Sequence, residues 1–167
     1  MGVLSDRLDG MRVRASSPDG MIVGELRNRT EVYLSFVDGT YRRYGKQALE
    51  DQLAGLARRL WAGRMREYYA AVSAAFGETI RGESPATGQR DVAYYAARDD
   101  LVAEGRSADG RVYVATQGMR NWTVRIADGT LRALTEEEFA VRVREAAGEL
   151  IRDQLGKIRE LKQQFYD

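Results

Sequence analysis

The sequence predicts an α+β protein built from two tandem ββ(β)α repeats, with antiparallel sheets, long helices and an internal pseudo-twofold axis. Three observations lead to this prediction: a motif that recurs at a constant offset of 90 residues, alternating segments beside Asp-Gly turns, and a long stripe of helical spacing after each set of strands. The offset divides the 167 residues into 1–82, the first repeat, and 83–167, a linker plus the second repeat.

The first hairpin of each repeat is the clearest shared feature. Ser17-Pro18-Asp19-Gly20 corresponds to Ser107-Ala108-Asp109-Gly110 without any insertion. A first strand (11–16 and 101–106) leads through this turn into a second strand (21–27 and 111–117), because glycine accepts the positive φ of a hairpin turn. Asp38-Gly39 and Asp128-Gly129 repeat in the same way. We interpret these four aspartates as turn residues rather than metal ligands or acid–base groups.

A third strand follows a second tight turn. Asn28 and Gly118 hold equivalent positions, and both residue types tolerate left-handed backbone. Residues 31–36 and 121–126 then alternate between apolar and polar side chains, which is typical of a sheet covered on one face. The Asp-Gly pair after each third strand is expected to lead into a short fourth strand or an irregular loop.

A long helix is expected to close each repeat. Thr135 and Glu138 form a capping-box pattern at the start of the second helix. The apolar stripes have spacings of three and four and step by one residue at the same place: Leu49, Leu53, Leu56, Leu60, then Trp61, Met65, Tyr68, Val72 and Phe76; and Phe139, Val143, Ala146, Leu150, then Ile151, Leu155, Ile158 and Phe165. Residues 77–89 are the predicted linker, and 89–100 a short helix. One such unit is marginal alone, so the two are expected to pack as a pseudo-dimer.

The residue composition excludes several classes of chemistry. The chain has no cysteine and no histidine, so disulfides, thiolate or imidazole catalysis and His or Cys metal centres are excluded. We expect no metal, no cofactor and no enzymatic activity, with Asp, Glu, Lys or Tyr catalysis left open. The longest apolar stretch, 68–76, falls far short of the ~20 residues of a membrane span, and no signal peptide is evident, so a cytoplasmic protein is expected.

Charge is balanced overall and uneven locally. The chain has 26 basic and 25 acidic residues, yet the segment from Arg27 to Arg66 contains nine basic residues and only four acidic ones. Arginine binds phosphate with two parallel donors, so this segment predicts a nucleic-acid-binding surface, on which Tyr41 and Tyr44 would stack on an unpaired strand. A solvated arginine-rich face is the alternative. The predicted contacts are Arg27, Arg29, Arg42, Arg43, Lys46, Arg58, Arg59, Arg64 and Arg66.

Aromatic residues on either side of the linker form a second candidate surface, for a protein partner, because tyrosine is enriched at interfaces. Core packing is the alternative, and exposure of some of the tyrosines would favour the partner role. A WxG motif at 61–63 and a YxxxD motif at 95–99 match type VII secretion substrates, but the predicted strands exclude that helical fold, so we interpret both as coincidence. The candidates are Trp61, Tyr68, Tyr69, Tyr94 and Tyr95.

The segments ASSPDGMIVGEL, GRSADGRVYVAT and TVRIADGTLRALTEEEFAVRVREAAGELIRD resemble the YbaB/EbfC family of small bacterial proteins, here in two tandem copies. The resemblance covers about 10–75 and 100–167 and implies nucleoid-associated DNA binding without catalysis. Diverged actinobacterial relatives of that fold are associated with type VII secretion, which implies an adaptor or chaperone instead. The chain departs from the family in lacking its long N-terminal helix and in carrying Asn28 where a turn glycine is usual.

The expected function is therefore DNA binding through the arginine-rich face of the first repeat. The alternative is a protein-binding adaptor or chaperone linked to type VII secretion. The expected partner is DNA or a protein and not a membrane, and self-association beyond the internal pseudo-dimer is left open.

Overall fold

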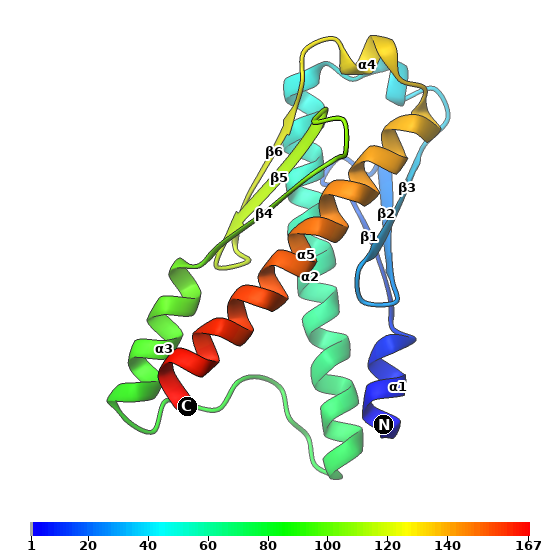
Figure 1. Ribbon diagram of the computed structural model, residues 1–167. Coiled ribbons are helices and arrows are strands. Elements are labelled where there is room, and N and C mark those ends of the chain that lie inside the picture. Colours follow the sequence, from blue (N-terminus) through cyan, green and yellow to red (C-terminus); the bar gives the residue numbers. More distant parts are fainter. Residues whose placement is uncertain (1) are drawn as a thin grey trace.

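The computed structural model describes residues 2–167 and contains two copies of a unit with a helix, three strands and a second helix (Figure 1). The first unit comprises α1 (Val3–Asp9), β1 (Arg12–Ser16), β2 (Ile22–Arg27), β3 (Glu31–Phe36), the 3₁₀ turn η1 (Tyr41–Arg43) and α2 (Lys46–Phe76). The second comprises α3 (Gln89–Asp100), β4 (Val102–Arg106), β5 (Val112–Gln117), β6 (Asn121–Ile126), α4 (Thr130–Ala133) and α5 (Glu136–Tyr166). This order confirms the predicted α+β fold with two tandem ββ(β)α units.

Each repeat forms one three-stranded antiparallel sheet with its strands in chain order. The alternation predicted for the third strands is confirmed, because Val32 and Phe36 of β3 and Val124 and Ile126 of β6 are buried. The middle strands, β2 and β5, also bury every second residue. One face of each sheet is therefore turned to the interior, and the other is turned to solvent.

The first hairpin turn is built identically in both repeats. The Ser17 hydroxyl donates to Asp19 Oδ1 (2.6 Å) and accepts from the Ile22 N–H (3.0 Å). Ser107 donates to Asp109 Oδ1 in the same way (2.8 Å), and the glycine after each aspartate has a positive φ. Asp19 and Asp109 are thus turn residues, as predicted.

The second hairpin turn contains two left-handed residues in succession. Asn28 and Gly118 have φ of 53° and 61°, as the pattern predicts, but Arg29 (φ 72°) and Met119 (φ 57°) are also left-handed. A non-glycine residue in this region costs roughly 1–2 kcal/mol. Burial of Met119 offsets that cost in the second repeat, and contacts of Arg29 described below do so in the first.

The connection after each third strand is neither of the expected forms. It makes a short helical turn, η1 in the first repeat and α4 in the second. Tyr41 accounts for this in η1: its ring lies 5.3 Å from Phe36 and 5.5 Å from Phe139, and its hydroxyl donates to the Leu134 carbonyl (3.0 Å). A helical turn places this ring in the core, which an extended strand would not do.

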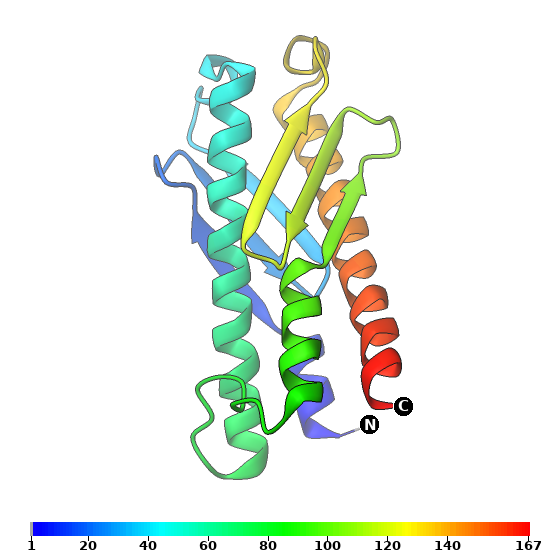
Figure 2. The ribbon, with the colours of Figure 1, turned by 90° about the vertical axis from the view of Figure 1, so that its left-hand side faces the viewer.

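The helices α2 and α5 lie between the two sheets (Figures 1 and 2). α5 begins with the predicted capping box, in which Thr135 Oγ1 accepts from the Glu138 N–H (3.1 Å) and Glu138 Oε1 accepts from the Thr135 N–H (2.9 Å). α2 packs on β1 and β2 of its own repeat and on β6 of the other, and α5 packs on β4, β5 and β3. Each helix therefore covers both sheets.

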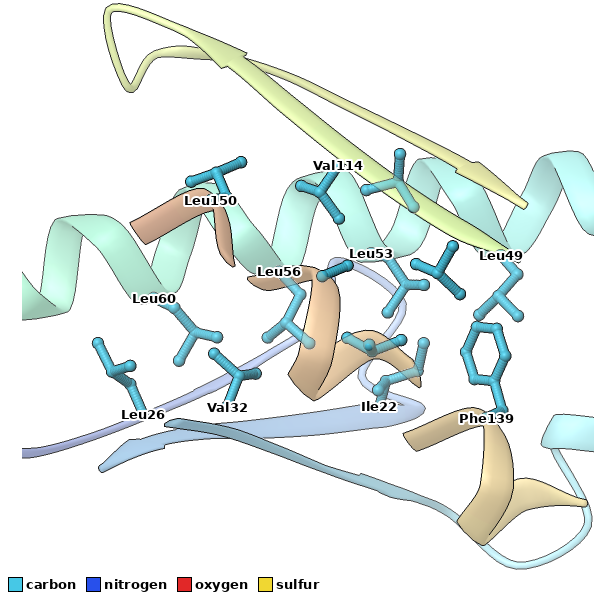
Figure 3. Close-up of a cluster of buried hydrophobic side chains, with 14 of the residues drawn as sticks. Ile22, Leu26, Val32, Leu49, Leu53, Leu56, Leu60, Val114, Phe139 and Leu150 are labelled. Carbon is cyan, nitrogen blue, oxygen red and sulfur yellow. The ribbon is translucent and has the colours of Figure 1, made fainter. Parts of the chain in front are cut away.

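One apolar core runs through both repeats. Figure 3 shows side chains of both repeats meeting there, including Ile22, Leu26, Val32, Leu49, Leu53, Leu56, Leu60, Val114, Phe139 and Leu150. The predicted stripes are buried as far as Leu60 and Ile151. Beyond these points the helices extend past the sheets, α1 packs on α2 and α3 packs on α5, and Phe76 is 68% exposed.

The segment 77–88 contains neither helix nor strand, and α3 follows it, as predicted. The Ser73 hydroxyl accepts from the Ile80 N–H (2.7 Å) and donates to the Ile80 carbonyl (3.0 Å), which fixes the linker to α2. The proposed division between 82 and 83 falls inside this segment. Within residues 2–167, no helix has the length and apolar character needed to cross a membrane.

Candidate functional site

Ion pairs engage three of the nine predicted phosphate contacts: Arg27, Arg29 and Lys46. Arg27 Nε donates to Glu25 Oε1 (2.7 Å), and its guanidinium lies 4.4 Å from the centre of the Tyr33 ring. This hydrogen bond lowers the pKa of Glu25 and raises the pKa of Arg27. Lys46 Nζ donates to Asp128 Oδ1 (2.6 Å), so it bridges the two repeats. Arg27 and Lys46 are therefore partly neutralised within the chain.

Arg29 and Arg59 also stabilise local structure. Arg29 Nε lies 2.8 Å from Asp9 Oδ1 and ties the second hairpin turn to α1. Arg59 donates to the carbonyls of Ser16 (3.0 Å) and Ser17 (3.3 Å) at the end of β1. Some donors of both guanidinium groups are therefore occupied by partners within the chain.

Arg64 is largely buried instead of lying on the predicted surface. Its guanidinium stacks 4.9 Å from the centre of the Trp61 ring, and no group within residues 2–167 accepts a hydrogen bond from its Nε. Burial, and then the nearby charge of Arg29, lower the pKa of Arg64. Its equivalent in the second repeat is Gln154, which is also buried. Both residues belong to the interior between the helices.

Arg64 borders a cavity of about 80 Å³ at the centre of the molecule. Its walls are apolar and come from both repeats, with Trp61 and Trp122 as the largest side chains. Their equivalents across the repeats are the smaller Ile151 and Val32. Because side chains at equivalent positions of the two repeats differ in size, they do not fill the space around the shared axis evenly. We attribute the cavity to this difference in side-chain size.

The other four predicted cations are exposed: Arg42, Arg43, Arg58 and Arg66. No ion pair within residues 2–167 engages them. Arg42 and Arg43 lie in η1, directly before α2, and Arg58 and Arg66 lie on α2. From the start of α2 to Arg66 the helix rises about 30 Å. These four arginines are named the basic stripe.

The predicted stacking role is wrong for Tyr41. Tyr41 is only 2% exposed, because it packs in the core. Tyr44 donates to Asp19 Oδ2 (2.6 Å), and burial raises the pKa of both tyrosines. The Tyr41 ring is therefore closed to a base, whereas Tyr44 is half-buried and meets Phe36 edge-on, with ring centres 6.2 Å apart.

The predicted partner residues fall into different environments. Trp61 lines the central cavity. Tyr68 is 38% exposed and meets the half-buried Tyr69 edge-on, with ring centres 5.2 Å apart. Tyr94 is buried, and the half-buried Tyr95 donates to a linker carbonyl, that of residue 84 (2.8 Å). The prediction that some of these tyrosines are exposed is thus met by Tyr68.

Sequence reasoning missed a row of carboxylates on α5. Three of them accept hydrogen bonds from outward-facing backbone N–H groups of β4 and the turn after it: Asp153 from Glu104 (3.0 Å), Glu149 from Arg106 (3.3 Å) and Glu145 from Ala108 (3.1 Å). Their spacing of four places them on one helix face. Comparison at the offset of 90 would have found them, because the α2 equivalents are Gly55, Arg59 and Gly63. Arg12 and Arg14, exposed on β1, were also missed.

The part of the chain that the structure describes contains no group of three or more His, Cys, Asp or Glu residues placed to hold a metal ion. Comparison of the chain with protein-family models, with curated proteins and with solved structures finds no match. The candidate sites therefore depend on their own geometry.

Proposed function

We propose that the protein is a non-enzymatic binding protein that associates with DNA through the basic stripe. The observation that supports this most directly is the exposure of Arg42, Arg43, Arg58 and Arg66 along η1 and α2 without an ion-pair partner in residues 2–167. Such arginines contact phosphates and carry no base readout by themselves. The expected binding is therefore independent of DNA sequence, and the compartment for this role is the cytoplasm with its nucleoid.

The number of free arginines sets the expected salt dependence. Each phosphate contact releases condensed counterions, so four contacts give a slope of about −3.6 in a plot of log K against log salt. Raising the salt from ~50 to ~200 mM should then weaken binding about 150-fold. The five remaining predicted cations add little, because they are paired, bonded to the backbone or buried.

A fluorescence-anisotropy titration with a labelled random-sequence duplex of ~20 base pairs, about twice the length of the stripe, tests this proposal. The double variant Arg43→Ala/Arg58→Ala should reduce the salt effect to about 12-fold. Its matched control, Arg132→Ala/Arg159→Ala, removes two exposed arginines of the second repeat and should leave the slope unchanged. Binding that is flat in salt, or an equal loss in both double variants, would refute the proposal.

A protein-binding adaptor is the second candidate, as expected from the alternative resemblance. It is favoured by apolar side chains exposed on the helices beyond the sheets, with Tyr68 38%, Phe76 68% and Val92 60% exposed. A folded protein that fails to bind the duplex at ~50 mM salt would favour this candidate over DNA association.

A further inference from the structure

β1 and β4 each lie at one edge of their sheet, and the two edges differ in the hydrogen-bond partners that the chain provides for them. Along β4 and the turn after it, the three α5 carboxylates described above accept hydrogen bonds from the outward-facing N–H groups, and Lys157 Nζ donates to the Val102 carbonyl (2.8 Å). An edge strand normally presents unpaired N–H and C=O groups to any extended chain that approaches. The second repeat closes this edge with its own helix.

The equivalent edge in the first repeat, β1, lacks these acceptors. Gly55 and Gly63 replace two of the carboxylates, and Arg59 replaces the third with the opposite charge. Close packing explains the glycines: a Cβ at Gly55 would lie under 3.0 Å from the Pro18 ring, and a Cβ at Gly63 would come as close to Val13. No carboxylate fits at these positions of α2.

The N–H groups left without these acceptors belong to Arg14 and Ser16. They correspond to Glu104 and Arg106 of β4, and the pairing of Val13 with Leu26 and of Ala15 with Gly24 directs them away from β2. No residue between 2 and 167 accepts a hydrogen bond from either of them. Arg59 covers only the carbonyls of residues 16 and 17 at the end of the strand.

The surroundings of this edge are strongly basic. Arg12 and Arg14 are exposed on β1, and Arg59 is exposed on α2. Glu25, which lies opposite Arg14 on β2, is held in its bond to Arg27. A second copy of this chain is therefore an unfavourable occupant. Antiparallel pairing of two β1 strands about Arg14 would set like charges opposite each other.

We propose that the β1 edge binds an extended acidic segment of a partner protein, which adds as a fourth strand to the first sheet. A partner residue that hydrogen-bonds with Arg14 across an antiparallel pair places its side chain on the same face as the Arg14 side chain. Acidic side chains at every second position of the partner segment would therefore face Arg12 and Arg14. The backbone carbonyls of the same segment would accept hydrogen bonds from the Arg14 and Ser16 N–H groups. The site lies outside the basic stripe, so it goes beyond the proposed DNA association.

The test uses the full chain and a fluorescein-labelled eight-residue peptide in which glutamate alternates with valine. Anisotropy should show saturable binding, and hydrogen exchange measured by NMR should slow at the Arg14 and Ser16 amides when the peptide is added. The same peptide N-methylated at each glutamate keeps its charge but cannot pair as a strand, and it should bind at least tenfold more weakly. Equal binding of the two peptides would overturn strand addition.

Two variants test the two contributions separately. Ser16→Pro removes one N–H that makes no internal bond, and an edge strand tolerates proline, so peptide affinity should fall about tenfold with little change in melting temperature. Arg14→Glu should abolish peptide binding, whereas Arg132→Glu, with the same change in net charge, should not. Arg14→Glu should also leave the salt slope for duplex DNA unchanged, which separates failure of this proposal from failure of the DNA role.

Three outcomes count against the proposal. Absence of saturable binding at ~1 mM peptide, a Kd corresponding to about −4 kcal/mol, would overturn it. Protection of the Arg14 and Ser16 amides by duplex DNA and not by peptide would assign the edge to nucleic acid. Protection that grows with protein concentration in the absence of peptide would assign it to a second copy.

Discussion

Replacing Gly105 by alanine should destabilise the protein by about 3 kcal/mol. A Cβ at this position of β4 would lie well under 3.0 Å from the Ala146 carbonyl oxygen and the Leu150 nitrogen, whereas ordinary contacts are 3.4–4 Å. Both atoms belong to the backbone of α5, so neither can rotate away, and the helix itself must shift. This places the cost at the upper end of the range of about 1–3 kcal/mol for overpacking.

Urea denaturation measures this cost, and thermal melting should show a decrease of about 6–12 °C for a chain of this size. Alanine substitutions at two other glycines serve as controls for the change in unfolding free energy. Gly24→Ala would bring a Cβ to 3.1 Å from the side-chain tips of Leu56 and Leu60, which can adjust, so a smaller loss of about 1 kcal/mol is expected. Gly156→Ala meets nothing within 4 Å on α5 and should stabilise by about 0.5–1 kcal/mol. Equal unfolding free energies for wild type and Gly105→Ala would refute the close approach of α5 to β4.

Three further predictions concern single side chains. Arg64→Met should raise the unfolding free energy by about 1 kcal/mol in urea denaturation, because it removes a largely buried charge without a carboxylate partner, and it should leave duplex binding unchanged; a loss of DNA affinity would place Arg64 in the interface. The hydrogen bond from Arg142 lowers the pKa of Asp109 to about 2 from its ordinary 3.8, so the stability it gives is present above about pH 4 and is lost as the pH falls towards 2. Melting curves of wild type and Arg142→Ala should therefore converge over that range, and a difference that stays constant would contradict the assignment. Thr135→Ala should cost about 1 kcal/mol in urea denaturation through loss of the capping box, and an unchanged midpoint would show that the Glu138 bond does not stabilise α5.

Local features of the fold were predictable from the sequence because the signals lie within a few residues of each other. The capping box of Thr135 and Glu138, the Ser17–Asp19 turn and the left-handed Asn28 each depend on neighbouring groups. The helical turn at Tyr41 was not predictable, because it forms to bury a ring against Phe139, nearly one hundred positions away in the chain.

The candidate site was less predictable because pairing partners come from distant segments. A count of basic residues between 27 and 66 does not show that Lys46 reaches Asp128 in the other repeat, or that Arg64 turns inward onto Trp61. The α5 carboxylates were readable in principle, since the difference between Arg59 and Glu149 at equivalent positions is visible in the sequence. Their role required knowing which strand lies at the edge.

The packing of α5 against β3 has a consequence for the order in which the chain is made. α5 is synthesised about 100 residues after β3, yet it covers part of the first sheet. At a synthesis rate of about 5–20 residues per second, α5 is made about 5–20 s after β3, and the apolar face of β3 lacks this helix during that time. During that interval the first repeat exposes an apolar surface through which the nascent chain can associate with other chains until α5 has been made.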